Sequence, residues 1–468
     1  MKLLVRPKPE KGESFIGYLV RLTELNAYDT PSWILSLAEI DCMELQWTFS
    51  FVFGKTTGLK RLAQLTNNTL DDLHALVYSP ANSSQGNTSE HEFDFYGASV
   101  NRSIIRPHHP KICPQCLAEF GYCLLVWDCS LVTACPIHEC TLLDKCPKCR
   151  RQIRAIRKSV SICGCGCDWR DFEPKRVAER EMSVSRQLYR LCNRRSSDEH
   201  CAPPKNPLNT LNLRDFIVAV TFLAGCKRSV SWATGRPSKS IKFSNSELHE
   251  LYAHAYSVFD DWPVNFFRFL KNKSKGPVRL QPHDGKLDTA LKREFGSFYG
   301  CLYQDLEGSQ FDFLREAFTQ FLTDRMHSHS LIPTGNSSAS PELAKYISLA
   351  DARRSLKITN ASLFDLMAAG EIRCAIVNRR RSPQFAVHTT DVEKLKGESE
   401  QSITPRDLAK QLGVNCEIIR QLASEGLVRP RARRSTDAFN TLRFPPGSAE
   451  QFLRAQVESY KSSVPEAQ

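Results

Sequence analysis

The chain has 468 residues, enough for several domains, and its hydrophobic fraction of 41% and charged fraction of 24% are those of ordinary globular proteins. It has no apolar run of the roughly eighteen residues that span a bilayer and no signal-peptide pattern, which excludes a membrane protein and predicts a cytosolic one. The net charge of +12 favours an anionic partner, although an excess of lysine and arginine on a solvated surface explains it equally well.

Residues 1–105 predict a helical domain with a pattern like a helix–turn–helix. Apolar residues follow helical spacing over 15–25, directly after Ser14, which is expected to cap that helix. A further helical pattern over 59–77 is broken at 66–69. A small helical core without a contact role explains this region equally well.

The cysteines are concentrated in one region, where eleven of the 18 lie between residues 113 and 167. In a reducing compartment, such clusters indicate a metal rather than disulfides. Three turns of the form Cys-Pro-x-(Cys/His) are followed by Cys-Gly-Cys, which fits a Cys₃His and a Cys₄ zinc site. The predicted ligands are Cys113, Cys116, Cys135 and His138 for the first site, and Cys146, Cys149, Cys163 and Cys165 for the second.

Residues 106–175 therefore predict a tandem zinc-ribbon or zinc-knuckle region with two structural Zn²⁺ ions. Complete sets of four ligands leave no open coordination position for catalysis. Cys167 competes with Cys163 and Cys165 for a place at the second site. An iron–sulfur cluster is an alternative for the Cys₄ site, but it would not explain His138 at the first site. Three more cysteines lie outside the turn pattern and are interpreted as buried small hydrophobic side chains: Cys123, Cys129 and Cys140.

The rest of the chain predicts one helical domain and two small repeats. Residues 176–330 return to helical periodicity with aromatic side chains in the core. The copies at 344–400 and 401–460 match at a constant offset of 56, as in Gly370 and Gly426. Each copy predicts two short helices, a hairpin and a last helix, which is the pattern of a winged helix–turn–helix. The predicted fold is thus mainly α and multidomain.

The motifs before residue 326 occur in a recognisable order. Gly12-Glu13-Ser14 comes first, the cysteine turns follow with Tyr122 and Trp127 between them, and Asp261-Trp262-Pro263 comes later. This order resembles the TniQ/TnsD family, the target-selection proteins of Tn-type DNA transposons. The resemblance covers about residues 10–325, and Cys167 stands at a variable position of the family pattern.

The resemblance implies a non-enzymatic adaptor that recruits an AAA+ ATPase transposition regulator to the insertion site. Some members of the family bind a DNA attachment site directly, and others dock on an RNA-guided CRISPR effector. The resemblance does not distinguish members that bind DNA directly from members that dock on a CRISPR effector, so this distinction depends on the C-terminal repeats.

In a winged helix–turn–helix, the second helix enters the major groove and the basic wing reaches the phosphates. The residues predicted near base edges are Asn360, Ser362, Asn415 and Arg420. The residues predicted at the DNA backbone are Arg379, Arg380, Arg381, Arg429, Arg431, Arg433 and Arg434, with Arg150, Arg151 and Arg154 in the loop of the second zinc site. Two alternatives remain: the repeats bind protein, or the loop is merely solvated.

The leading hypothesis is a sequence-specific DNA-binding target-site selector of the bacterial cytoplasm, associated with the nucleoid and without enzymatic activity. Its expected partners are double-stranded DNA and the AAA+ regulator, with no membrane; a homodimer is left open. The alternative is an adaptor on a CRISPR effector complex and its guide RNA. An enzyme is disfavoured, because the sequence has no nuclease-like acidic cluster, nucleophile elbow or phosphate-binding glycine loop.

Overall fold

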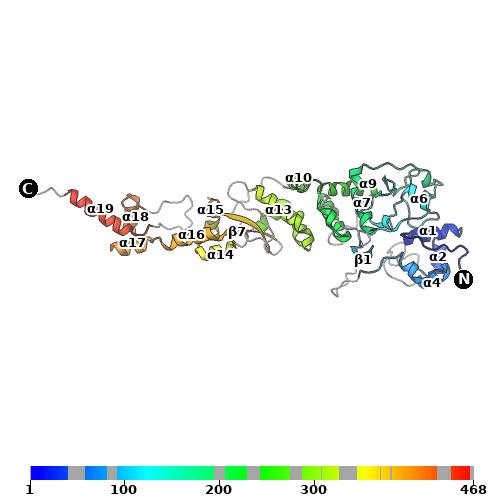
Figure 1. Ribbon diagram of the computed structural model, residues 1–468, viewed down its shortest axis with the longest axis horizontal. Coiled ribbons are helices and arrows are strands. Elements are labelled where there is room, and N and C mark those ends of the chain that lie inside the picture. The colour runs from blue at the N-terminus through cyan, green and yellow to red at the C-terminus, as the bar shows by residue number, and fades with distance from the viewer. Residues whose placement is uncertain are drawn as a thin grey trace, which may run out of the picture. The chain divides into compact units, whose positions relative to one another are not determined.

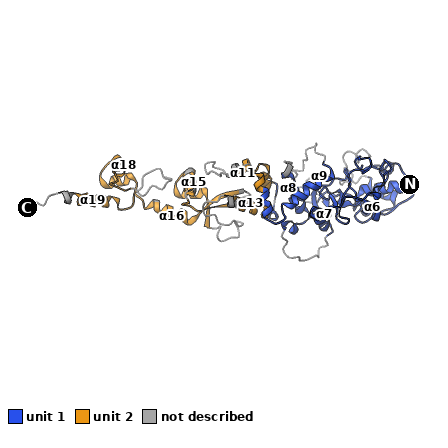
Figure 2. Ribbon diagram, turned by 90° about the horizontal axis from the view of Figure 1, so that it is seen from above, with its two compact units in different colours: residues 1–269, 305–311 blue, residues 270–304, 312–468 orange. Residues whose placement is uncertain are grey.

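The computed structural model of the chain describes residues 2–40, 58–81, 92–193, 206–228, 243–274, 287–306, 308–325, 345–368, 370–379, 382–429 and 444–463. Helices predominate and the sheets have two or three strands, so the predicted mainly-α class is confirmed. The chain forms two compact units, residues 1–269 with 305–311 and residues 270–304 with 312–468 (Figure 2). The described residues include no helix with the length and apolar character that a bilayer crossing requires.

The N-terminal helices are short, and Ser14 caps the first of them as predicted. They are α1 (Phe15–Leu25), α2 (Ser32–Leu37), α4 (Leu59–Thr66) and α5 (Leu70–His74) (Figure 1). The Ser14 hydroxyl accepts a hydrogen bond from the Gly17 N–H at 3.1 Å. Thr69 and Asp72 form a capping box at α5, after α4 has ended in the left-handed Asn67.

The start of α1 is attached to the cysteine-rich segment by backbone hydrogen bonds. The Ser14 N–H donates to the Cys123 carbonyl at 2.9 Å, and the Leu125 N–H donates to the Gly12 carbonyl at 2.7 Å. Helix α1 then passes so close to Cys123 that a Cβ atom on Gly17 would lie 2.8 Å from both the Cys123 Cβ and the Ser14 Oγ. Gly17 is therefore required by close packing rather than by an unusual backbone conformation.

We expect Gly17→Ala to lower the free energy of unfolding by about 1–3 kcal/mol, because the added methyl group meets a buried side chain and the helix cap. The control is Gly397→Ala in α16 (Thr389–Glu400), where an added Cβ meets nothing within 4 Å. That change should stabilise by about 0.5–1 kcal/mol. Urea denaturation measures both, and equal effects would contradict the packing argument.

A two-stranded hairpin, which the sequence did not predict, follows the N-terminal helices. Strand β1 (Glu92–Phe95) pairs with β2 (Ala98–Asn101), and Tyr96 and Gly97 turn between them with positive φ angles of 52° and 81°. Phe93 and Phe95 are buried on its inner face. Each strand has only four residues, which is too short for alternation alone to reveal.

A buried carboxyl lies in the core of this unit. The Tyr78 hydroxyl donates to Asp128 Oδ2 at 2.9 Å, and Asp128 is only 7% exposed. Burial raises the pKa of Asp128 to about 7, although the Tyr78 hydrogen bond and the charge of Lys111 act in the opposite direction.

Asp128 should make the protein less stable as the pH rises from about 4 to about 7. In this window the folded state keeps a proton that the unfolded chain, with the ordinary pKa of 3.8, has already released. The shift corresponds to at most about 4 kcal/mol. Asp128→Asn keeps an acceptor for Tyr78, and the difference in unfolding free energy between this variant and wild type should depend on pH. A constant difference would show that Asp128 is already ionised in the folded protein.

Three helices pack beside the cysteine-rich segment: α7 (Glu179–Cys192), α8 (Leu213–Arg228) and α9 (Asn245–Ser257), with α9 in contact with both others (Figure 1). The Asn245 side-chain amide donates to the carbonyls of Thr133 and Leu142 at 2.8 Å each. The Ser185 hydroxyl of α7 accepts from the N–H groups of Thr133 and Ala134 at 3.2 Å. These buried hydrogen bonds fix the helices to strand β3 (Ala134–Cys135).

The predicted helical domain at 176–330 contributes to both compact units. Helix α10 (Val264–Lys273) begins in the first, and the short helix η5 (Ser309–Phe311) returns to it. In the second unit, α11 (Leu287–Phe295), α12 (Ser297–Gln304) and α13 (Asp312–Arg325) enclose an aromatic core. Its rings include Phe295 and Phe318, with centroids 5.1 Å apart, and the predicted aromatic core is confirmed here.

The second unit also contains the two C-terminal repeats. The first copy consists of β5 (Tyr346–Ser348), α14 (Leu349–Leu356), α15 (Asn360–Ala368), β6 (Cys374–Arg379), β7 (Ser382–His388) and α16, with an antiparallel sheet in the order β5-β7-β6. The second copy contains α17 (Pro405–Leu412), α18 (Cys416–Ser424) and α19 (Ser448–Ser463).

Candidate metal centres and nucleic-acid-binding elements

The first candidate metal centre joins a helix start to a strand turn. Cys113 caps α6 (Pro114–Phe120), and Pro114 occupies the first helical position, where its missing N–H costs nothing. Cys116 lies in the first turn of this helix. Cys135 ends β3, and His138 follows in the turn to β4 (Cys140–Thr141). The Cys116 and His138 N–H groups point at the preceding sulfurs, at 3.5 and 3.4 Å.

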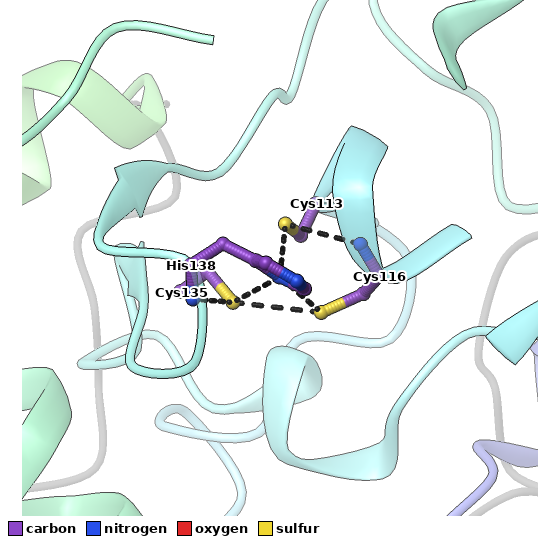
Figure 3. A group of neighbouring side chains, drawn as sticks. All are labelled: Cys113, Cys116, Cys135 and His138. Atoms are coloured by element: carbon purple, nitrogen blue, oxygen red, sulfur yellow. Dashed lines mark hydrogen bonds between the residues drawn. The ribbon is translucent and has the colours of Figure 1, made fainter. Parts of the chain in front are cut away.

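The four side chains converge on one point (Figure 3). The His138 Nδ1 atom lies 3.5 Å from the Cys113 sulfur, 3.2 Å from that of Cys116 and 3.6 Å from that of Cys135. The Cys116 and Cys135 sulfurs are 3.5 Å apart. Since a tetrahedral zinc ion binds sulfur at about 2.3 Å, its sulfur ligands lie about 3.8 Å apart, and this set is close to that spacing.

The imidazole of His138 has a partner on its outer side. Its Nε2 atom lies 3.2 Å from the carboxylate of Glu119, which projects from α6. A carboxylate on the second ring nitrogen fixes the orientation of a metal-binding histidine. The Nδ1 atom therefore faces the sulfurs.

The second candidate centre is built by two tight turns. Lys145 and Gln152 pair around the turn with Cys146 and Cys149, and Ile162 and Asp168 pair around the turn with Cys163 and Cys165. The sulfurs of Cys146 and Cys165 are 3.8 Å apart, as are those of Cys149 and Cys163. These distances equal the edge of a zinc–sulfur tetrahedron.

Backbone N–H groups favour the thiolate at this centre. Burial opposes ionisation of Cys146, but the N–H groups of Lys148 and Cys149 point at its sulfur and bring its pKa down to about 6. Cys167, the competing ligand, lies outside the set of four, and its sulfur lies 3.7 Å from the Asp168 carbonyl. The structure thus brings together the eight residues predicted from the sequence.

Metal content should separate ligands from bystanders. We expect Cys149→Ser to reduce the zinc content of the purified chain from two ions to one, because a Cys₄ site needs all four sulfurs. Cys167→Ser, the matched control two residues beyond Cys165, should keep both ions. Mass spectrometry of the intact protein and elemental analysis measure the content. Loss of a metal in the Cys167 variant alone would reverse the assignment.

The basic loop between the turns of the second centre divides into exposed and fixed residues. Arg150, Arg151 and Arg154 are exposed, as a phosphate contact requires. Arg157 is not available for a phosphate contact, because its guanidinium donates to the carbonyls of Arg154 and Ser159 and lies over the Trp169 ring at 5.7 Å.

The two C-terminal copies have the same helix pair at an offset of 56 residues. Helices α14 and α17 begin and end 56 residues apart, and so do α15 and α18. Their caps correspond as well, because Thr359 accepts from the Ser362 N–H at 3.2 Å and Asn415 from the Ile418 N–H at 3.0 Å. Gly370 and Gly426 both have positive φ, at 73° and 74°. The predicted internal repeat is confirmed.

The structure adds two details to the predicted first copy. The predicted last helix is α16, which extends from Thr389 to Glu400, and the Thr390 hydroxyl in its first turn contacts His388 and Arg373. Strand β5 adds an unpredicted third strand, with Ile347 opposite Val387.

The residues predicted near base edges lie on the second helices of the copies. Asn360 begins α15 and is exposed, whereas the Ser362 hydroxyl is bonded to that of Thr359 at 2.9 Å. Asn415 caps α18 and is exposed. Arg420 is 62% exposed and forms an ion pair with Glu417 at 2.9 Å.

The predicted backbone-contacting arginines are only partly covered by the structure. Arg379 is the last residue of β6, opposite Ser382 in β7, and Arg429 is exposed after the buried Val428. The others lie outside the described residues: Arg380, Arg381, Arg431, Arg433 and Arg434.

Sequence reasoning missed two residues at the first centre. Cys140 was interpreted as a small hydrophobic side chain, and it is buried, but its sulfur lies 3.6 Å from that of Cys113. No sequence motif marks Glu119, although its position about one turn beyond Cys116 on the short helix α6 places its carboxylate beside the ligands. Cys123 and Cys129 are buried and belong to neither set of four.

Comparison with known families gives a match in the first unit. Residues 4–142 match the family model of TniQ, a stretch that contains α1 and all four ligands of the first centre. The domain associates the chain with transposition. The chain thus contains a TniQ domain over these residues, as the resemblance predicted. The search of curated proteins finds no match.

Proposed function

We propose that the protein is a sequence-specific DNA-binding target-site selector for a Tn-type transposon, which recruits an AAA+ transposition regulator to the insertion site. The observation that carries the proposal is the repeated pair of capped helices in residues 345–429, which accompanies a TniQ domain. Target-site selection requires an element that binds the target DNA, and this repeat is a candidate for that element within the same chain.

The repeat has the order of elements of a winged helix–turn–helix. In the first copy, α14 and α15 are joined by three residues and followed by the β6–β7 hairpin and by α16, which packs on α14. The second helix of such a unit enters the major groove, and the hairpin is the wing. The helix N-termini favour phosphate through their N–H groups and dipole, and exposed Asn360 and Asn415 stand at these ends.

Exposed cations on the helix pairs complement DNA. Arg353, Arg354 and Lys357 lie at the end of α14, and Arg406 and Lys410 lie on α17; all five are exposed. The first helix of a helix–turn–helix crosses the DNA backbone, so phosphate contacts are expected from it.

For the two metal centres, we propose structural Zn²⁺. Each has four soft or borderline ligands at tetrahedral spacing, which leaves no coordination position for a substrate. Such an ion contributes on the order of 10 kcal/mol to folding. We propose a non-enzymatic protein, whose zinc region and helices form a frame for the surface that engages the regulator.

The DNA-binding test uses full-length protein and transposon-flanking DNA. We expect Arg420→Ala to reduce discrimination between the target and unrelated DNA by about 5- to 150-fold, the range of one base contact. Changing Arg379, Arg380 and Arg381 to alanine should weaken binding to all sequences and reduce the slope of log affinity against log salt by about 1 for each lost phosphate contact. Footprinting and fluorescence anisotropy at several salt concentrations measure both effects.

Two controls accompany these variants. Glu417→Ala removes the partner of Arg420 but leaves the arginine, and should preserve discrimination. Arg180→Ala removes an exposed arginine of α7, outside the repeats, and should change neither quantity. If wild-type protein shows no sequence preference at physiological salt, target reading by the repeats is refuted. Stable association with a CRISPR effector and its guide RNA would then support the adaptor alternative.

A further inference from the structure

A fifth metal-binding side chain, Cys140, lies beside the first metal centre but outside the set of four whose donor atoms all lie within 4.8 Å of one another. Besides the predicted ligands, the Cys140 sulfur lies 3.6 Å from the Cys113 sulfur. Cys140 is directly opposite Cys135 across the β3–β4 pair, and its side chain is also in hydrogen-bonding contact with that of Cys135. A tetrahedral zinc ion has four places, so one of the five donors is always in excess.

The backbone around Cys140 is held from two sides. It pairs with Cys135 in β4, and it forms a second antiparallel bridge with Arg176. The next residue, Thr141, donates its N–H to the Lys175 carbonyl at 3.1 Å. Cys140 is 1% exposed, so its sulfur is held beside the centre and away from solvent.

His138 is held differently, because it lies in the turn between the two strands. The turn passes through Glu139, whose φ of 50° is left-handed. The outer nitrogen of His138 faces the carboxylate of Glu119, which is 54% exposed at the rim of the site. The imidazole therefore has a partner that does not depend on contact between Nδ1 and the sulfurs.

We propose that Cys140 is a reserve ligand of the first metal centre, and that it takes the place of His138 to convert a Cys₃His site into a Cys₄ site. This inference rests on the proposed metal at that centre. The Cys140 sulfur binds as a thiolate, and its proton passes to the released imidazole, which stays beside Glu119. The site thereby keeps four ligands when its histidine is lost, and a soft metal ion finds an all-sulfur set.

The test compares variants of the full-length protein by metal content and by the absorption spectrum after replacement of zinc with Co²⁺. His138→Ala should retain two metal ions, and its sulfur-to-cobalt charge-transfer band should be stronger than that of wild type, because one nitrogen has been exchanged for one sulfur. The double variant His138→Ala/Cys140→Ser should retain one ion. Cys140→Ser alone should retain two, because His138 remains.

The matched control is His138→Ala/Cys192→Ser, in which a half-buried cysteine of α7 outside both centres is changed, and it should retain two ions. The proposal is overturned if His138→Ala retains one ion, or if its cobalt spectrum shows no additional sulfur. The spectrum is decisive even where the double variant does not fold. If wild-type protein holds no metal at the first centre, the proposal of structural zinc and the proposal of a reserve ligand both fail. If only the His138→Ala prediction fails, the proposal of structural zinc stands and the reserve-ligand proposal is refuted.

Discussion

The fold of the first unit depends on the convergence of sulfur ligands at two points. When ionised, sulfurs 3.5 to 3.8 Å apart repel one another strongly, and the proposed Zn²⁺ between them offsets this repulsion. Between Lys111 and Asp171 the regular elements are two short helical turns, the seven-residue α6 and a two-residue strand pair. Regular secondary structure thus fixes little of the path of this segment, and the proposed metal ligation supplies a further constraint.

The rest of the unit is attached to this segment through polar contacts at defined points. Helix α1 is bonded to it at Cys123 and Leu125, and its Glu24 carboxylate accepts from the Ser159 hydroxyl and the Val160 N–H at 2.7 and 2.9 Å. Helices α7 and α9 are bonded to it at Thr133. Buried hydrogen bonds of this kind stabilise only when both partners are in place. The helices therefore depend on the order of the segment they contact.

The sequence predicted those structural features whose defining residues lie close together in the chain. The eight metal ligands lie in tight turns with fixed spacing, and the helix pairs of the C-terminal copies have caps within three residues, so both were recognisable. The β1–β2 hairpin and strand β5 have three or four residues per strand, which is too few for a clear period. The role proposed for Cys140 depends on its position opposite Cys135, and pairing between strands cannot be recognised from the spacing of cysteines along the chain. The division of residues 176–330 between two units is set by packing between distant segments.

The attachment of the Ser14 N–H to the Cys123 carbonyl has a consequence for how the protein is produced in the cell. With the proposed zinc in place, α1 is docked on a segment ordered by metal ligation, so the N-terminal part of the chain is synthesised before its docking surface can form. These helices complete their packing only after residues beyond 165 have been synthesised and the proposed ion has bound. Under this proposal, the supply of the ion limits how much newly made chain folds, and it couples the abundance of a transposition protein to the metal supply of the cell.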